Sequence, residues 1–204
     1  MNVFVETNFV LELIFQRDHY AVCQQLLEMA ERNDIKLWLP AYSIVEPYES
    51  IIRRRKSRRQ TYDALSRELA DITRSVPFEE KANELAQLTG LLLQVGEVEQ
   101  DEARTVISRL LKLATLINLD TAILQSALFA QESMSLGPQD AVVFASIMSR
   151  IDAQSAPSCF ITKNSKDFSD PVIVDQFEQC SCKLFFDFKR AFDYTEHRLK
   201  KNPS

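Results

Sequence analysis

Glycine, histidine and tryptophan are scarce in this chain of 204 residues, which contains three, two and one of them. So little glycine argues against a loop-rich all-β fold and against the glycine-rich loops that cradle phosphates. Neither a P-loop nor a dinucleotide-binding fingerprint is present. The chain is long enough for one sizeable core, so we expect a single domain over residues 1–204.

The sequence also lacks a recognisable zinc module. Its four cysteines are Cys23, Cys159, Cys180 and Cys182; the last two are too close to form a ligand pair, and no second pair exists. We therefore expect them to be reduced structural thiols.

Long hydrophobic runs are absent. No apolar stretch approaches the roughly 20 residues that span a bilayer, and the first residues lack the basic segment and cleavage site of a signal peptide. These absences predict a cytoplasmic protein with no membrane partner.

Charge is unevenly distributed. Residues 53–59, RRRKSRR, carry six positive charges, so the net charge of −5 divides into +6 on this segment and −11 on the rest. An acidic body with one basic segment suits a local phosphate contact rather than a surface that coats nucleic acid. The candidate phosphate-binding residues are Arg53, Arg54, Arg55, Lys56, Arg58 and Arg59. The alternative is an ordinary solvated helix.

Five short apolar segments have the composition of buried parallel strands: 2–6, 36–39, 115–119, 158–162 and 183–186. Helical periodicity fills the intervals between them. This alternation predicts an α/β fold whose central, mostly parallel sheet is covered by helices on both faces.

A helix-rich insertion over about 53–113 elaborates this core. The apolar stripe of its first helix stops at Ile52 and resumes at Tyr62, and the basic run stands between them. Because six cations within seven residues point all around a helix, we expect this stretch to pack on no side.

Polar side chains gather where strands end and helices begin. Glu6, Thr7 and Asn8 follow the first strand, and Thr162, Asn164 and Asp167 follow the fourth. Two further acids, Glu46 and Asp140, lie near the start of helices that follow strands. Carboxyl ends of parallel strands share one edge of a sheet, so these groups should meet there. Clustered carboxylates without histidine or cysteine favour Mg²⁺ or Mn²⁺.

The order of these motifs resembles that of the PIN-domain nucleases, which include the VapC-like toxins of toxin–antitoxin pairs. The matching stretches are VFVETNFVLEL (3–13), LPAYSIVEPYE (39–49), GPQDAVVFASIM (137–148) and CFITKNSKDF (159–168). The resemblance implies a three-layer α/β/α sandwich and metal-dependent hydrolysis of RNA. It also implies an acidic quartet of Glu6, Glu46, Asp140 and Asp167, supported by Thr7, Asn8, Thr162 and Asn164.

This sequence departs from the family pattern at its first acid, where Glu6 stands in place of the usual Asp. The extra methylene displaces the carboxylate by about 1.5 Å, one carbon–carbon bond. Asn164 competes with Asp167 for the fourth position, and Glu49 is an additional candidate ligand one turn from Glu46.

Several interpretations stay open. In the first interpretation, the chain is a metal-dependent endoribonuclease with RNA as its substrate and an antitoxin or a second copy as a candidate partner. Alternatively, it cleaves DNA, or it is a catalytically degenerate PIN fold that binds nucleic acid or serves in assembly. Each motif alone also has a structural explanation, in helix capping or in a solvated turn.

Overall fold

Five parallel strands form the centre of the protein in a computed structural model that describes residues 1–151 and 157–201. They are β1 (Asn2–Val5), β2 (Lys36–Pro40), β3 (Thr115–Ile117), β4 (Ser158–Ile161) and β5 (Cys182–Phe185). Their order across the sheet is β3-β2-β1-β4-β5, and every neighbouring pair is parallel. The predicted α/β class with a parallel sheet is confirmed.

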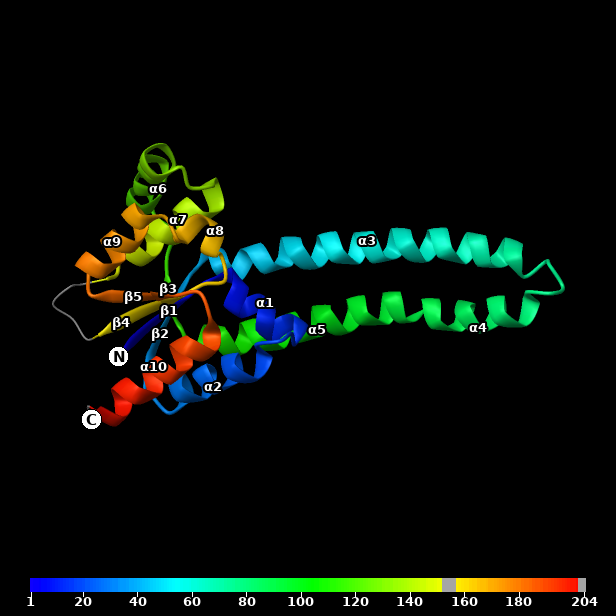
Figure 1. Cartoon of the computed structure of the whole chain (residues 1–204), viewed down its shortest axis with the longest axis horizontal. Coiled ribbons are helices and arrows are strands. Elements are labelled where there is room, and N and C mark those ends of the chain that lie inside the picture. The colour runs from blue at the N-terminus through cyan, green and yellow to red at the C-terminus, as the bar shows by residue number, and fades with distance from the viewer. Residues whose placement is uncertain (152–156, 202–204) are drawn as a thin grey trace. The chain divides into compact units, whose positions relative to one another are not determined.

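Helices cover both faces of this sheet (Figure 1). The elements of this part are α1 (Thr7–Phe15), α2 (Tyr20–Glu31), α6 (Thr121–Met134), α7 (Pro138–Met148), α8 (Ser165–Phe168), α9 (Pro171–Gln179) and α10 (Phe188–Lys201). In Figure 1, α6, α7 and α9 lie on one face, and α1, α2 and α10 lie on the other. Strands buried on both sides explain why the segments read as continuous apolar runs.

Aromatic side chains fill the core under α7 and α9. Phe160 of β4 lies 5.4 Å from Phe177 of α9 between ring centroids, and Phe177 meets Phe144 of α7 edge to face at 5.7 Å. On the opposite face, the ring of Phe9 from α1 lies 6.0 Å from Phe188 of α10. Large buried rings at these positions fix the helices against the strands that carry the candidate site.

The four cysteines are all free, as expected, and three of them are buried. Within the two described ranges, no helix combines the length and the apolar character that crossing a membrane requires.

The chain divides into two compact units. The first, residues 1–46 and 106–204, contains the sheet; the second, residues 47–105, is helical. The helical unit is built from α3 (Tyr42–Ile72), α4 (Glu79–Thr89) and α5 (Leu91–Leu113), of which α3 and α5 continue into the first unit. The insertion predicted from sequence was 53–113.

The helical unit is an antiparallel hairpin with coiled-coil spacing. On α3 the series is Tyr48, Ile51, Arg55, Arg58, Tyr62, Leu65, Leu69 and Ile72, and on the returning arm it is Phe78, Ala82, Leu85, Thr89, Leu92, Gly96, Glu99 and Ala103. Both series alternate steps of three and four residues, which is the heptad pattern. Every buried residue between positions 48 and 105 falls on one of them. The two series therefore form the seam of the hairpin.

A charged pair occupies the middle of this seam. Arg58 donates two hydrogen bonds to Glu99, at 2.5 Å and 2.7 Å, and Arg54 lies 3.5 Å from the same carboxylate. The side chains of Arg58 and Glu99 are only 22% and 11% exposed. The expectation that the basic run packs on no side is therefore wrong at Arg58, because a partner carboxylate on the facing arm neutralises it. A buried charged pair among the apolar residues of such a seam fixes the register of the two arms.

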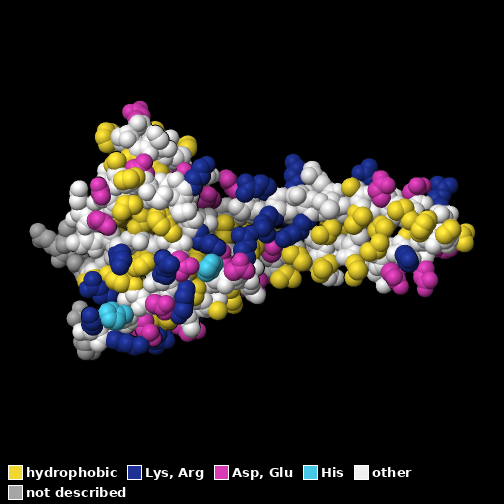
Figure 2. All heavy atoms as spheres, viewed as in Figure 1, with side chains coloured by type: hydrophobic (Ala, Val, Ile, Leu, Met, Phe, Trp, Pro, Cys, Tyr) yellow, Lys and Arg dark blue, Asp and Glu magenta, His cyan; other side chains and the backbone are white. Residues whose placement is uncertain are grey.

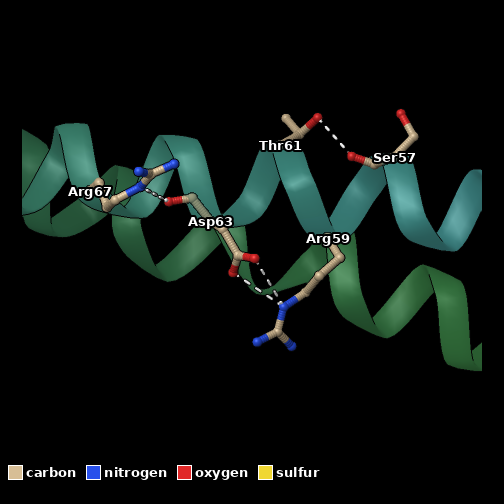
Figure 3. A network of polar contacts seen from close by, with 5 residues as sticks. All are labelled: Ser57, Arg59, Thr61, Asp63 and Arg67. Carbon is tan, nitrogen blue, oxygen red and sulfur yellow. Dashed lines mark hydrogen bonds and ion pairs between the residues drawn. The ribbon is translucent and has the colours of Figure 1, made fainter.

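Other cations of the run are satisfied within the same unit. Arg59 folds along α3 onto Asp63 at 3.1 Å, one turn away (Figure 3). Arg55 donates to the side-chain oxygen of Gln100 at 3.0 Å. Exposed pairs of this kind contribute only a few tenths of a kcal/mol, so they leave the cations able to change partners.

The Arg58–Glu99 pair yields a stability prediction. Glu99→Ala should destabilise the hairpin by about 1–3 kcal/mol, because it leaves a largely buried guanidinium without its acceptor. Glu97→Ala, an exposed position on the same helix, is the matched control and should change little. Amide hydrogen exchange over residues 47–105 measures the effect. Equal protection in the two variants would contradict it, and a Leu pair at 58 and 99 should restore protection.

Candidate functional site

The candidate site lies at the carboxyl ends of β1 and β4, where the strand order reverses. Successive strands from β1 to β3 run to one side of the sheet, and β4 and β5 lie on the other side of β1. In open parallel sheets the loops at such a reversal diverge and leave a crevice for ligands. A pocket of about 390 Å³ is present there, lined by Glu6, Thr7, Asn8, Leu11, Glu46, Gln139, Asp140, Val143, Lys163 and Asn164.

Glu6 joins β1 to α1 and explains the polar residues inside an apolar stretch. Its backbone is extended, and its side chain caps α1 by accepting the Asn8 backbone N–H at 3.0 Å. The other carboxylate oxygen accepts from the Asn8 amide at 2.6 Å and from the Thr162 hydroxyl at 3.0 Å. Glu6 is only 6% exposed. It is thus a buried acid at a helix N-terminus, held by hydrogen bonds from α1 and from the residue that follows β4.

Burial raises the pKa of Glu6 from its ordinary value of 4.5 to about 7. The desolvation of the ionised carboxylate is the main cause, and the nearby charge of Glu46 adds to it. The hydrogen bonds from Asn8 and Thr162 act in the opposite direction because they stabilise the ionised form. At neutral pH this group is therefore balanced between its two protonation states.

Glu46 reaches the pocket from the first turns of α3. Its Oε2 accepts a short hydrogen bond from the hydroxyl of Thr7, the first residue of α1. Thr7 and Glu46 are separated by 39 residues, so this bond ties the helix after β1 to the helix after β2. Adjacent strands of a parallel sheet thus deliver two of the predicted acids to one pocket.

Asp140 enters from the first turn of α7. Gly137 caps that helix and Pro138 occupies its first position, which places Asp140 two residues later beside the free N–H groups. Its Oδ1 accepts from the Asn164 amide at 2.8 Å. Burial raises the pKa of Asp140, the Asn164 bond lowers it, and the charge of Asp167 raises it. Asn164 in turn is held by its own N–H, which donates to Thr162 at 2.9 Å.

Asp167 has a different position from the other three acids. It lies in the short helix α8 and does not line the pocket, although its charge acts on Asp140. Asn164, the competing candidate for the fourth place, lines the pocket directly. The site therefore gathers Glu6, Glu46 and Asp140 with Thr7, Asn8 and Asn164, and Asp167 lies outside the pocket lining but close enough for its charge to act on Asp140.

Lys163 is a pocket residue that was not predicted from the sequence. It follows Thr162 and forms an ion pair of 3.2 Å with Glu12, whose side chain is 5% exposed on α1. Glu12 also accepts the backbone N–H of His19 at 3.0 Å. A lysine beside three acids partly offsets their repulsion. The signal was its place between two predicted site residues, in the stretch TKN.

The donor set suits a hard divalent cation in kind. Three carboxylates and neutral oxygen or amide groups line one pocket without histidine or cysteine, as Mg²⁺ and Mn²⁺ prefer. Within the described part of the chain, no group of three or more His, Cys, Asp or Glu side chains is arranged to hold a metal ion. Each pocket acid is instead bonded to a neutral donor: Glu6 to Asn8 and Thr162, Glu46 to Thr7, and Asp140 to Asn164.

Thr162 connects the two halves of this network, which makes it testable. Thr162→Val should cost about 1–3 kcal/mol, because Glu6 loses a donor and the Asn164 N–H loses its acceptor in a buried position. Thr195→Val is the matched control: that hydroxyl is equally buried but bonds Ala191 O in its own helix and the thiol of Cys159, neither of which lines the pocket. Urea unfolding compares the two. Equal losses would show that the Thr162 hydroxyl does not organise the site.

The predicted phosphate-binding residues all lie in the helical unit, on α3. Hydrogen bonds and ion pairs engage Arg54, Arg55, Arg58 and Arg59 within that unit. For Arg53 and Lys56, which are exposed, no ion pair is found among the described residues.

Comparison with protein-family models, with curated proteins and with solved structures gives no match for this chain. The functional conclusion consequently depends on the residues and geometry of the site itself.

Proposed function

We propose that this protein is a metal-dependent nuclease that hydrolyses phosphodiester bonds of RNA. One observation carries the proposal: Glu6, Glu46 and Asp140, which come from distant parts of the chain, line one pocket at the strand-order reversal. Glu6 is buried, and Glu46 and Asp140 are half-buried. Carboxylates that repel one another in such surroundings are costly, and a ligand that needs them is the simplest reason to keep them.

The fold we propose for this function is the three-layer PIN-like sandwich. The parallel sheet with helices on both faces is compatible with it. The four sequence stretches that resemble PIN domains supply the three pocket acids and also Thr7, Asn8, Thr162 and Asn164. The proposal extends to a toxin-like role with an antitoxin partner in the cytoplasm.

The residues have distinct roles in this proposal. Glu6, Glu46 and Asp140 would hold Mg²⁺ or Mn²⁺, with Asp167 as an outer acid. When bound, such an ion polarises the scissile phosphate and lowers the pKa of an attacking water. Asn8, Thr162, Thr7 and Asn164 orient the carboxylates through their hydrogen bonds. Lys163 supplies a positive charge near the phosphate.

The basic run would bind the RNA backbone. Because Arg58 stabilises the hairpin through Glu99, the cleaner test replaces Arg53 and Lys56 with Gln. RNA affinity should fall, and the slope of log affinity against log salt should become shallower by about 0.7 for each phosphate of a single strand that the variant no longer neutralises. Arg67→Gln, on the same helix outside the run, is the control. Affinity is measured by fluorescence anisotropy. If the salt slope of the variant equals that of the wild type, the basic run is an ordinary solvated helix that does not contact RNA.

A second candidate is a degenerate PIN fold that binds nucleic acid without cleaving it. The observation that favours this candidate is that each pocket acid is already satisfied by a neutral donor. Glu6 also stands where the PIN family usually has Asp. A pocket whose acids are hydrogen-bonded in this way would be stable without a metal.

Cleavage assays separate the two candidates. Matched single-stranded RNA and DNA oligonucleotides are incubated with the protein in Mn²⁺ and, in parallel, in EDTA. The nuclease proposal expects Mn²⁺-dependent cleavage of RNA with 5′-phosphate products. Binding without cleavage in Mn²⁺ would support the degenerate fold, and preferential cleavage of DNA would change the substrate.

A further inference from the structure

The hairpin of residues 47–105 has an incomplete core. Its buried hydrophobic residues, all of them within the described chain, are Ile51, Leu69, Ala82 and Ala103, and two of these are alanines. Large apolar side chains remain outside, including seam residues: Leu65 is 41% exposed and Leu85 is 54% exposed. Figure 2 shows hydrophobic side chains gathered along this part of the molecule. Two helices alone do not cover these side chains.

The tip of the hairpin exposes two large apolar side chains. Val76 is 85% exposed and Phe78 is 56% exposed, in the turn between α3 and α4. Two acids, Glu79 and Glu80, follow at once in the first turn of α4. The tip therefore presents an apolar turn immediately followed by negative charge.

The opposite end of the same hairpin has a complementary feature. A cavity of about 260 Å³ is lined by Tyr48, Ile51, Ile52 and Ala103 together with Arg55 and Arg104. Ile52 is 66% exposed there. Arg55 bonds to a neutral amide, and Arg104 pairs with Asp101 at the surface, where the two side chains are 67% and 76% exposed. An apolar cavity with two cations matches an apolar turn with two acids.

We propose that the hairpin is a self-association surface, on which a second copy of this chain docks antiparallel. A two-fold axis across the middle of the hairpin places the tip of each copy in the cavity of the other, so one type of interface is made twice and the assembly closes as a dimer. Leu65, Leu88 and Leu91, which lie between tip and cavity along the sequence and are exposed, cover one another near the axis. Self-complementarity selects a second copy as the occupant, because both halves of the interface are present in one chain.

The first test is the oligomeric state of the full chain. Sedimentation and light scattering should give twice the chain mass of 23.5 kDa for the wild type. Phe78→Asp should weaken self-association at least tenfold while retaining the helical circular dichroism. Phe129→Asp, at a comparably exposed Phe on α6 that is 67% exposed, should leave the dimer intact. A wild type that stays monomeric at high concentration, or equal effects of the two variants, would overturn the proposal and assign the surface to a different partner.

Charge reversal tests the pairing of tip and cavity. Glu79→Lys with Glu80→Lys should shift the wild-type dimer toward monomer, and so should Arg55→Glu with Arg104→Glu. All four substitutions in one chain should recover the dimer. No recovery in the combined variant would overturn the proposed docking.

Cysteine cross-linking tests the antiparallel arrangement without disturbing folding. Ile52→Cys and Val76→Cys are made in separate chains, which are mixed under reducing conditions and then oxidised. Only the mixture should yield a covalent dimer through positions 52 and 76, because like positions lie at opposite ends of the assembly. Each variant alone controls for the native cysteines. Equal cross-linking in the unmixed variants, or none in the mixture, would overturn the arrangement.

Discussion

Asp140→Asn is expected to reduce Mn²⁺-dependent cleavage of RNA by about a hundredfold or more. A metal stabilises the transition state by several kcal/mol, and each 1.4 kcal/mol is a factor of about ten in rate. The substitution keeps the size of the side chain and an oxygen that can accept the 2.8 Å bond from Asn164, but it removes the charge. The folded state should not suffer, because burial already disfavours the ionised carboxylate.

Asp175→Asn provides the control for this loss. Asp175 is exposed on α9 and lies outside the pocket, so its variant should cleave at the wild-type rate. Single-turnover cleavage at saturating RNA, measured across a Mn²⁺ titration, separates weakened metal binding from slower chemistry. An Asp140→Asn protein with full activity would remove this residue from the site and count heavily against a nuclease.

Glu6→Gln is expected to make the metal-free protein more stable at pH 8 and to leave it nearly unchanged at pH 4.5. The folded-state pKa of Glu6, about 7, lies above its ordinary 4.5. Between these values the folded protein binds more protons than the unfolded chain, so stability is lost as pH rises through this window. Each pKa unit corresponds to about 1.4 kcal/mol, so the wild type loses about 3 kcal/mol of unfolding free energy above pH 7, and Glu6→Gln does not lose it.

Urea unfolding in EDTA at pH 4.5, 6 and 8 measures this dependence. Glu178→Gln, at an exposed acid on α9, should show no pH-dependent gain. Adding Mn²⁺ at pH 8 should stabilise the wild type and stabilise Glu6→Gln much less, since the metal compensates the buried charge. If Glu6→Gln instead melts markedly lower at pH 8 in EDTA, Glu6 has a structural role as an ionised cap.

The strands and the α/β class could be predicted because a doubly covered parallel sheet imposes a simple pattern on the sequence. The segment at 2–6 is largely apolar because both of its faces are buried, and the structure has β1 there. The pocket acids were also foreseeable, since the carboxyl ends of neighbouring parallel strands share an edge. Asp167 was harder to place because it lies in the short helix α8 and does not line the pocket, and no local pattern in the sequence distinguishes it from Asn164, which does.

The hairpin shows what single-helix periodicity misses. Along α3 alone, Arg55 and Arg58 interrupt an apolar stripe. Their partners, Gly96 and Glu99, lie on the facing arm about 40 residues later in the same heptad spacing; an added Cβ at Gly96 would stand 3.6 Å from Arg55 Cγ. Polar residues at seam positions become interpretable only when both arms are aligned. Lys163 was missed for a similar reason, because its buried partner Glu12 lies 151 residues away.

The central position of β1 has a consequence for the order in which the protein is made. Val3 pairs with Leu37 on one side and with Cys159 on the other. A ribosome adds about 5–20 residues per second, so roughly 6–25 s pass between the synthesis of Leu37 and that of Cys159. Throughout that interval one edge of β1 is unsatisfied, and Glu6 lacks the Thr162 hydroxyl that β4 delivers. The pocket is therefore completed only after Asn164 has been made. A product that terminates before residue 162 would lack Thr162, and one that terminates before residue 140 would lack Asp140 as well.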